Sequence, residues 1–260
     1  MLISSVILVL REVLEAAILI SVLLALSANS RFNFRWLWYA TPFALCGSLL
    51  YATSLDTITD ALDGAGQEVT NASLQLIVFL LILIIVAANP VKNIASRHWI
   101  KKLMSLAVAC ALIREGSEIY IYITGFSSAE ALRTAVFTGS AIGASIGISL
   151  GILLFSILRI QTTIRCNQLC LLLLTFIGAG MVMQATILLE QADWIPASKA
   201  LWDSSNLLDE QSVTGELLYA VFGYESTPSL IQVIIYCLSF ISIISAWFYA
   251  ATPKSTTNVL

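Results

Sequence analysis

Seven apolar stretches, each long enough or nearly long enough to cross a bilayer, dominate this 260-residue chain. Crossing ~30 Å of hydrocarbon takes about 20 residues of helix. Because unpaired backbone groups are costly in lipid, and because the stretches lack the alternation of barrel strands, we expect helices. The stretches are Leu2–Ala28, Trp36–Leu55, Ala72–Ala88, Leu103–Ile123, Ala135–Leu158, Leu169–Leu189 and Leu230–Ala250.

Composition supports the same fold class. Only 11% of the residues are charged, against roughly 25% in a soluble domain, so the solvent of most of the chain is lipid. The first stretch carries Arg11, Glu12 and Glu15, which favours a membrane span over a signal peptide. We expect a single all-α domain over residues 1–260, a polytopic membrane protein with seven transmembrane helices. The ends of the third helix are the least defined.

The loops alternate in charge. Basic residues occupy the first, third and fifth loops and the C-terminal tail: Arg31, Arg35, Lys92, Arg97, Lys101, Lys102, Arg159, Arg165 and Lys254. Acidic residues occupy the second loop, at Asp56, Asp60, Asp63 and Glu68, and most of the sixth, residues 190–229. Cytoplasmic loops are enriched in Lys and Arg. We therefore expect a multi-pass protein of the cell membrane with its N-terminus outside and its C-terminus in the cytoplasm.

One short pattern occurs twice. An Arg-Glu-x-x-Glu motif occurs in LREVLEAAIL of the first stretch and in IREGSEIYIY of the fourth. The two copies begin at Arg11 and Arg114, 103 residues apart. Each copy opens a unit of three helices, an odd number, so the second unit enters the membrane upside down. We expect an inverted 3+3 repeat, about residues 1–100 and 101–195, with the seventh helix, residues 230–250, outside it. Transporters built this way bind their substrates between the repeats.

The two motifs place charge where charge is costly. An ionised side chain at mid-bilayer costs about 2.5–3.5 kcal/mol on insertion scales. At 100° per residue, the two glutamates of a motif lie about 60° apart, so all three charges share one face. The four glutamates, Glu12, Glu15, Glu115 and Glu118, and the two arginines sum to −2. Because carboxylates prefer hard cations, the glutamates are candidate metal ligands, and Arg11 and Arg114 support them.

Other interpretations of the motifs remain open. A structural ion-pair network could lock two helices together, but two symmetric copies with surplus negative charge favour a cation. A di-iron enzyme would need Glu-x-x-His pairs, and the only histidine, His98, lies in a basic loop. We therefore expect no enzyme activity and no permanently bound cofactor. On charge alone, iron, manganese, magnesium and calcium all remain possible substrates.

The glycines of the fifth stretch, the acidic outer loops and the net charge each support a further expectation. Four glycines at four-residue spacing, Gly139 to Gly151, predict a face of the fifth helix that another helix approaches closely. The acidic outer loops either raise the local cation concentration by their negative potential or are solvated loops whose charge reflects topology and solubility. Glu190 and Asp193 are the candidate outer contacts. A net charge of −3 argues against nucleic acid as a partner.

The paired motifs resemble the hallmark of the oxidase-dependent iron permeases, which include fungal high-affinity iron permeases and bacterial iron-uptake permeases. The hallmark Arg-Glu-Gly-x-Glu is intact from Arg114 to Glu118, whereas Val13 replaces its glycine in the first copy. The segments LWDSSNLL (201–208) and VFGYESTPSLIQV (221–233) are also similar to the family's region before its last helix. The resemblance implies an iron permease in which the four glutamates handle iron.

The resemblance also implies a partner, because fungal members work with a multicopper ferroxidase and bacterial ones with periplasmic oxidising or iron-binding proteins. We therefore expect an extracytoplasmic oxidase or iron-binding protein beside this chain. Two alternatives stay open from the residues themselves. One is a permease for another divalent cation such as lead or manganese. The other is a non-transporting membrane subunit that docks a periplasmic oxidase.

Overall fold

The computed structural model describes residues 2–88, 97–127, 130–210 and 212–251. Two of the basic residues assigned above to odd loops and the tail, Lys92 and Lys254, lie outside these ranges. The described residues are helical apart from loops and one isolated bridge between Ala200 and Ser229. The helices are α1 (Leu2–Asn29), α2 (Arg35–Thr53), α3 (Leu55–Ala61), α4 (Gly66–Ala88), α5 (Arg97–Ser127), α6 (Glu130–Ile160), α7 (Thr163–Gln191), α8 (Val213–Phe222) and α9 (Leu230–Ala251).

The expectation of an all-α membrane protein is confirmed. Each predicted stretch lies on one long helix, except that the second runs past the end of α2 into α3. Within the described residues, four helical segments are long and apolar enough to cross a bilayer: Gly66–Ala88, Leu132–Ile160, Thr163–Gln191 and Leu230–Ala250. Several helices extend beyond their apolar stretches, because hydrophobicity marks the part in lipid and backbone hydrogen bonding continues past it.

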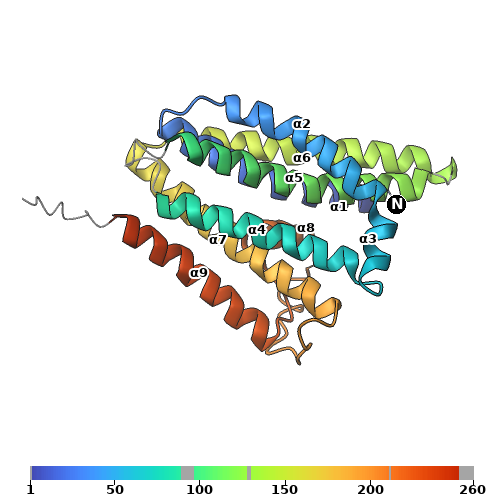
Figure 1. Cartoon of the computed structure of the whole chain (residues 1–260). Helices are drawn as coiled ribbons and strands as arrows, with labels where there is room; N and C mark the ends of the chain where they lie inside the picture. Colours follow the sequence, from blue (N-terminus) through green and yellow to red (C-terminus); the bar gives the residue numbers. More distant parts are fainter. Residues whose placement is uncertain (1, 89–96, 128–129, 211, 252–260) are drawn as a thin grey trace, which may run out of the picture.

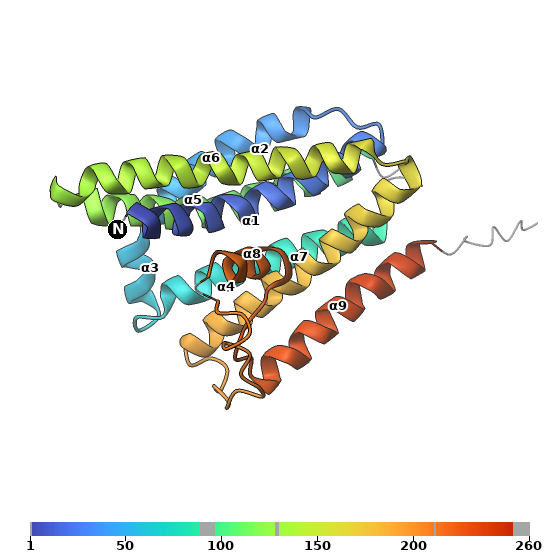
Figure 2. The ribbon, with the colours of Figure 1, turned by 180° about the vertical axis from the view of Figure 1, so that it is seen from behind.

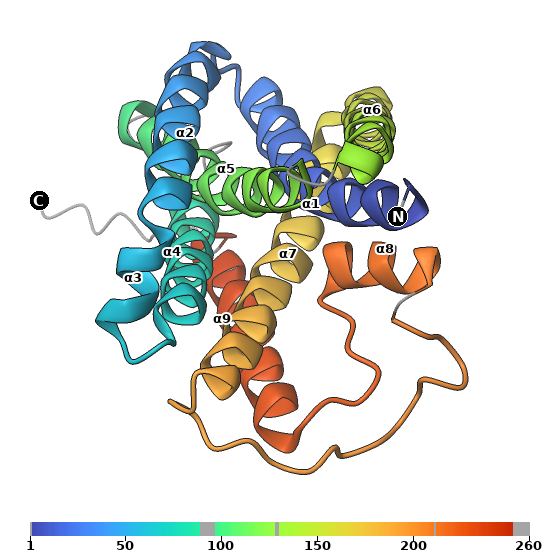
Figure 3. The same cartoon turned by 90° about the vertical axis from the view of Figure 1, so that its right-hand side faces the viewer.

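The long helices form two groups that run roughly along one direction (Figures 1 and 2). In the first group α1 packs along α6, and α2 packs along α5. In the second group α4 packs against α7, and both contact α9. The short helix α8 touches α1 and α7 (Figure 3). The first turn of α1 and the last turn of α9 lie at opposite ends of the bundle (Figures 1 and 2).

The predicted close approach at the glycine face of α6 is confirmed. A Cβ atom added to Gly143 would lie 2.5 Å from the carbonyl oxygen of Val6, and one added to Gly139 would lie 2.7 Å from that of Leu2. The hydroxyl of Ser21 donates a hydrogen bond of 2.7 Å to the carbonyl oxygen of Gly151. These contacts hold α6 against the backbone of α1, the helix that carries the first motif.

The valine of the first motif also packs on this face. A Cβ atom added to Gly147 of α6 would lie 2.9 Å from Cγ1 of Val13. In the second motif the glycine is in the motif itself and the larger residue is on the neighbouring helix: Gly116 leaves room for the hydroxyl of Ser48 from α2. The departure from glycine at Val13 is therefore accommodated by a glycine on the neighbouring helix.

Charge separates toward the two ends of the bundle. The end where α1 stops and α2 and α5 start carries Arg31, Arg35, Lys101, Lys102, Arg159 and Arg165. The opposite end carries α3, the α7–α8 loop and most of the acidic residues outside the motifs (Figure 1). Between the charged motifs and the basic end lies a buried apolar core that includes Leu19, Leu23, Leu26, Ile82 and Met104.

Candidate metal site

The two motifs meet where α1 and α5 cross in the interior of the bundle. Glu12, Glu15, Glu115 and Arg114 are at most 5% exposed, whereas the side chain of Glu118 is 27% exposed. The helical spacing predicted from the sequence explains this placement, because all charges of a motif share a face that cannot point at lipid.

Arg114 is the central cation of the site. Its Nη1 atom donates to Glu15 Oε2 at 3.1 Å, to Glu115 Oε1 at 2.8 Å and to Gln184 Oε1 at 3.3 Å. Its Nε atom lies 3.3 Å from Glu118 Oε1. One buried guanidinium thus contacts carboxylates from both motifs. Because a planar guanidinium presents several donors in a fixed geometry, Arg114 sets the positions of three glutamates at once.

Arg11 occupies the edge of the site and connects it to α8. Its Nε atom donates to Glu15 Oε1 at 3.5 Å, and its Nη1 lies 3.5 Å from Glu216 Oε2. The guanidinium also stacks over the ring of Tyr219, with its carbon 4.0 Å from the ring centroid. Sequence reasoning assigned Glu216 only to an acidic outer loop. The fold of α8 back onto α1, which has no local sequence signal, brings it beside the first motif.

Three of the four motif glutamates form a compact group. Oxygens of Glu12, Glu115 and Glu118 lie within 4.8 Å of one another. Oε2 of Glu12 and Oε2 of Glu115 are buried and have no hydrogen-bond partner among the described residues. Carboxylates at this distance repel one another, and a cation between them removes the repulsion. Oxygens on opposite sides of a hard cation bound at about 2.0–2.6 Å stand about 4–5 Å apart, so the group fits such an ion.

Glu15 differs from the other three. It accepts from Arg11 at 3.5 Å, from Arg114 at 3.1 Å and from the amide of Gln184 at 3.4 Å. Both of its oxygens are therefore engaged by side-chain donors. The sequence pattern does not distinguish the four glutamates. In the structure, Glu15 is paired with side-chain donors, whereas the other three form the group that contains the unpaired oxygens.

Three amide side chains that sequence reasoning missed complete the surroundings. Gln184 of α7 contacts both Arg114 and Glu15, and Gln75 of α4 donates to Gln184. Asn71 donates to Glu118 Oε1 at 3.1 Å and accepts from the hydroxyl of Tyr51 at 2.8 Å. The available signal was their polarity, because a glutamine inside an apolar stretch is costly unless it is hydrogen-bonded.

A cavity of about 580 Å³ connects this group to the acidic end of the bundle. Glu12 and Glu118 lie on its wall together with Glu68 and Asn71 from α4. Its remaining lining comes from α1, the N-terminal part of α4 and the C-terminal parts of α5 and α7: Leu8, Gln67, Ile121, Tyr122, Gly125, Phe126, Leu188 and Gln191. The carboxylates can therefore be reached by an ion from the acidic end.

The two outer candidates, Glu190 and Asp193, do not line this cavity. Glu190 accepts from the hydroxyl of Ser229 at 3.0 Å and from the amide of Gln232, so it joins the end of α7 to the start of α9. Asp193 lies exposed in the turn after α7, with φ of 57°. The structure thus does not bring either residue to the motif glutamates.

A second group of neighbouring carboxylates includes Glu210, just before α8, and Glu225, just after it. Burial, together with the negative charges of Glu210 and Glu190, raises the pKa of Glu225 to about 7. Glu210 itself accepts a hydrogen bond from the backbone of Ser226. These acids of the sixth loop form a group separate from the motif glutamates, and close to the start of α9.

Comparison with known proteins gives one match. The family model described as Iron permease FTR1 family matches residues 2–252 of the chain. No curated protein and no solved structure matches the chain.

Proposed function

Because this chain belongs to the iron permease FTR1 family, we propose that it moves iron across the cell membrane into the cytoplasm on the carboxylates of Glu12, Glu115 and Glu118. Membership makes the chain a membrane transport protein rather than an enzyme. The proposal adds the direction, the site and the mechanism. Iron is the substrate here, and the proposed mechanism needs no permanently bound cofactor.

The carboxylate group at the inner end of the acidic cavity carries the proposal. Its oxygens lie within 4.8 Å of one another, and two of them are buried without a partner among the described residues. A purely structural ion-pair network gains nothing from such oxygens, because an unpaired buried acceptor costs about 1–3 kcal/mol. All-oxygen ligands also suit a site that must release its ion.

Glu15 and the two arginines position this group in the proposed mechanism. Arg114 contacts both Glu15 and Glu115, which fixes the second motif relative to the first. Four motif glutamates and two arginines sum to −2, and Glu216, 3.5 Å from Arg11, makes the sum −3. That surplus attracts a highly charged cation.

The helix contacts support an inverted repeat of α1, α2, α4 and α5, α6, α7. A two-fold relation that exchanges α1 with α5 and α2 with α6 turns the α1–α6 contact into the α5–α2 contact, and both are extensive. The same relation maps the α4–α7 and α1–α5 contacts onto themselves, and both are present. With α9 added, we propose seven membrane-spanning helices, the acidic end outside and the basic end in the cytoplasm.

Iron enters from the acidic cavity in this proposal and leaves toward the basic end. Acidic residues at the cavity mouth raise the local cation concentration. Packed apolar side chains such as Leu23 and Met104 block the route from the motifs to the basic end. Release therefore requires a second arrangement of the two repeats, as in alternating access. We propose that an extracytoplasmic oxidase or iron-binding protein delivers the iron at the acidic end.

Reconstitution tests the proposed transport. The purified chain in proteoliposomes should accumulate radioactive iron, and a tenfold excess of unlabelled manganese or lead should leave most of the uptake. Complete suppression by either metal would assign the site to a broader divalent-cation permease. Absence of uptake of both ferric and ferrous iron, in protein that is folded and correctly inserted, would favour a docking subunit without transport activity.

A further inference from the structure

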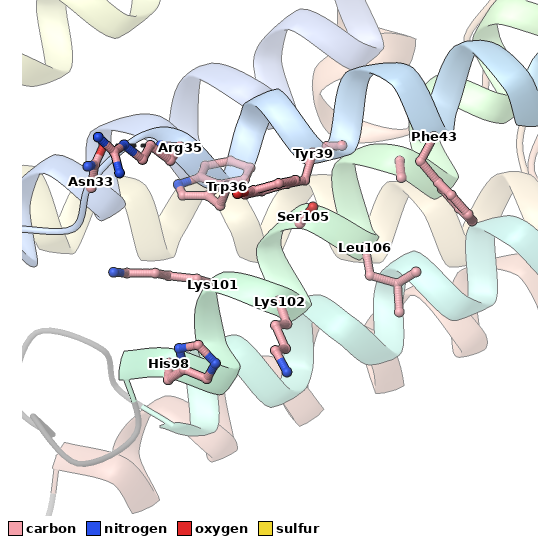
Figure 4. A pocket seen from close by; sticks show the side chains of 12 residues that line it. Asn33, Arg35, Trp36, Tyr39, Phe43, His98, Lys101, Lys102, Ser105 and Leu106 are labelled. Atoms are coloured by element: carbon pink, nitrogen blue, oxygen red, sulfur yellow. Dashed lines mark hydrogen bonds between the residues drawn. The ribbon is translucent and has the colours of Figure 1, made fainter.

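A cavity of about 640 Å³ opens between α2 and α5 at the basic end of the bundle (Figure 4). It is separate from the acidic cavity, with which it shares no lining residue. One wall comes from the start of α2 and the residues just before it, and the other from the start of α5. Its lining residues are Asn33, Arg35, Trp36, Tyr39, Ala40, Phe43, His98, Lys101, Lys102, Ser105, Leu106 and Ala109.

The polar part of this cavity is positively charged. Arg35, Lys101 and Lys102 line it together with His98, and no acidic residue does. None of these three cations has a salt bridge to a carboxylate in the described parts of the chain. In contrast, both motif arginines, Arg11 and Arg114, contact glutamates. Lys101 lies over the ring of Phe32, 5.3 Å from the centroid, a contact that leaves its charge without a counterion. An anion from outside the chain can therefore pair with these cations.

The rest of the cavity is apolar and open to the bilayer. Tyr39 is 74% exposed, Phe43 60% and Leu106 42%. Trp36 forms the buried floor, where its indole nitrogen donates to the hydroxyl of Ser27 at 3.1 Å. Figure 4 shows Arg35 and Lys101 toward one end of the site, with Tyr39 and Phe43 following along α2. Cations thus stand next to an apolar, partly aromatic surface, as an amphiphile with an anionic head requires.

We propose that this cavity binds one anionic phospholipid from the leaflet at the basic end. Its phosphate lies between Arg35 and Lys101, with Lys102, which points another way from α5 (Figure 4), adding to the positive potential, and one acyl chain lies along Tyr39, Phe43 and Leu106. Basic pockets between membrane helices on the cytoplasmic side are suited to anionic head groups. A free anion would leave the aromatic surface unused, and a neutral lipid would leave the cations unpaired. The proposal does not depend on the identity of the transported metal.

Native mass spectrometry of the purified chain tests this site. After incubation with phosphatidylglycerol, the wild type should keep one lipid per chain, whereas phosphatidylcholine should be lost. The double variant Lys101→Gln/Lys102→Gln should retain at least roughly tenfold less phosphatidylglycerol, because each cation near an anionic head group strengthens binding several-fold. The matched control is Arg159→Gln/Arg165→Gln, which removes two exposed cations from the same end, outside the cavity, and should bind as the wild type does.

Three results with the wild type, the double variant and the control would overturn the proposal, and so would a fourth with the Arg35→Gln variant. The first is equal retention of phosphatidylglycerol by the double variant and the control. The second is displacement of the lipid by inorganic phosphate at equal concentration, which would indicate a site for a free anion. The third is a dimer that the double variant dissociates, which would assign this face to a second copy of the chain. If the double variant does not fold, Arg35→Gln should still lower retention several-fold, and unchanged retention by that variant would equally overturn the proposal.

Discussion

Glu118→Gln should lower the initial rate of iron uptake by at least roughly 100-fold and leave the protein folded in the membrane. The change keeps the shape of the side chain and its acceptor for Asn71, 3.1 Å away, but removes one of three clustered negative charges. Loss of groups that merely support a metal ligand already costs about 10–100-fold, so loss of a ligand should cost more. Uptake of radioactive iron into proteoliposomes, normalised to inserted protein, measures the effect.

The control for this change is Asp60→Asn, which neutralises an exposed acid of α3 at the same end of the bundle. We expect it to lower uptake by less than twofold, because a single solvated charge adds little to the outer potential. Glu12→Gln and Glu115→Gln should behave as Glu118→Gln does. Normal uptake by a well-folded Glu118→Gln variant would remove Glu118 from the metal site.

Arg114→Gln should destabilise the protein far more than Arg11→Gln. Removing one partner of a buried ion pair costs about 3–5 kcal/mol, and Arg114 contacts three glutamates with a side chain only 6% exposed. For a chain of this size that corresponds to roughly 10 °C in Tm. The side chain of Arg11 is 29% exposed, so its loss should cost about 1 kcal/mol. Thermal unfolding in detergent, followed by tryptophan fluorescence, compares the two.

A double variant separates lost pairing from lost packing. Arg114→Gln combined with Glu15→Gln should recover part of the stability, because the second change removes a carboxylate that the first left unpaired. Neighbouring groups in one network show coupling of about 0.5–3 kcal/mol. Equal Tm values for Arg114→Gln and Arg11→Gln, or strict additivity in the double variant, would contradict the central position of Arg114.

The helices and the inward-facing motifs could be predicted because they depend on local sequence. Apolar stretches identify long helices, and the spacing from Arg11 to Glu15 puts the charges of the motif on one face. The glycines of α6, spaced by four, likewise indicated a close helix contact that the structure confirms at Gly143. In each case the pattern repeats within a few turns of one helix.

The remaining parts of the site depend on contacts between distant segments. Gln184 reaches Glu15 across 169 residues of sequence. The helix α8 brings Glu216 to Arg11 from the sixth loop, and no local pattern indicates that α8 packs on α1. The separation of Glu15 from the other three glutamates also follows from tertiary packing, since the two motifs are nearly identical as sequences. Glu190 was an outer candidate because it is acidic and lies in the sixth loop. That observation does not predict its hydrogen bonds to Ser229 and Gln232.

Anomalous diffraction at the iron edge, from crystals of the purified chain soaked with iron, tests the central claim most directly. The account predicts a peak among Glu12, Glu115 and Glu118, with an oxygen of each within about 2.0–2.6 Å of the ion and Glu15 still paired with Arg114. The same crystals of Glu118→Gln should show no peak there. A wild-type peak at Glu190 and Asp193 alone, with none between the three motif carboxylates, would contradict the account.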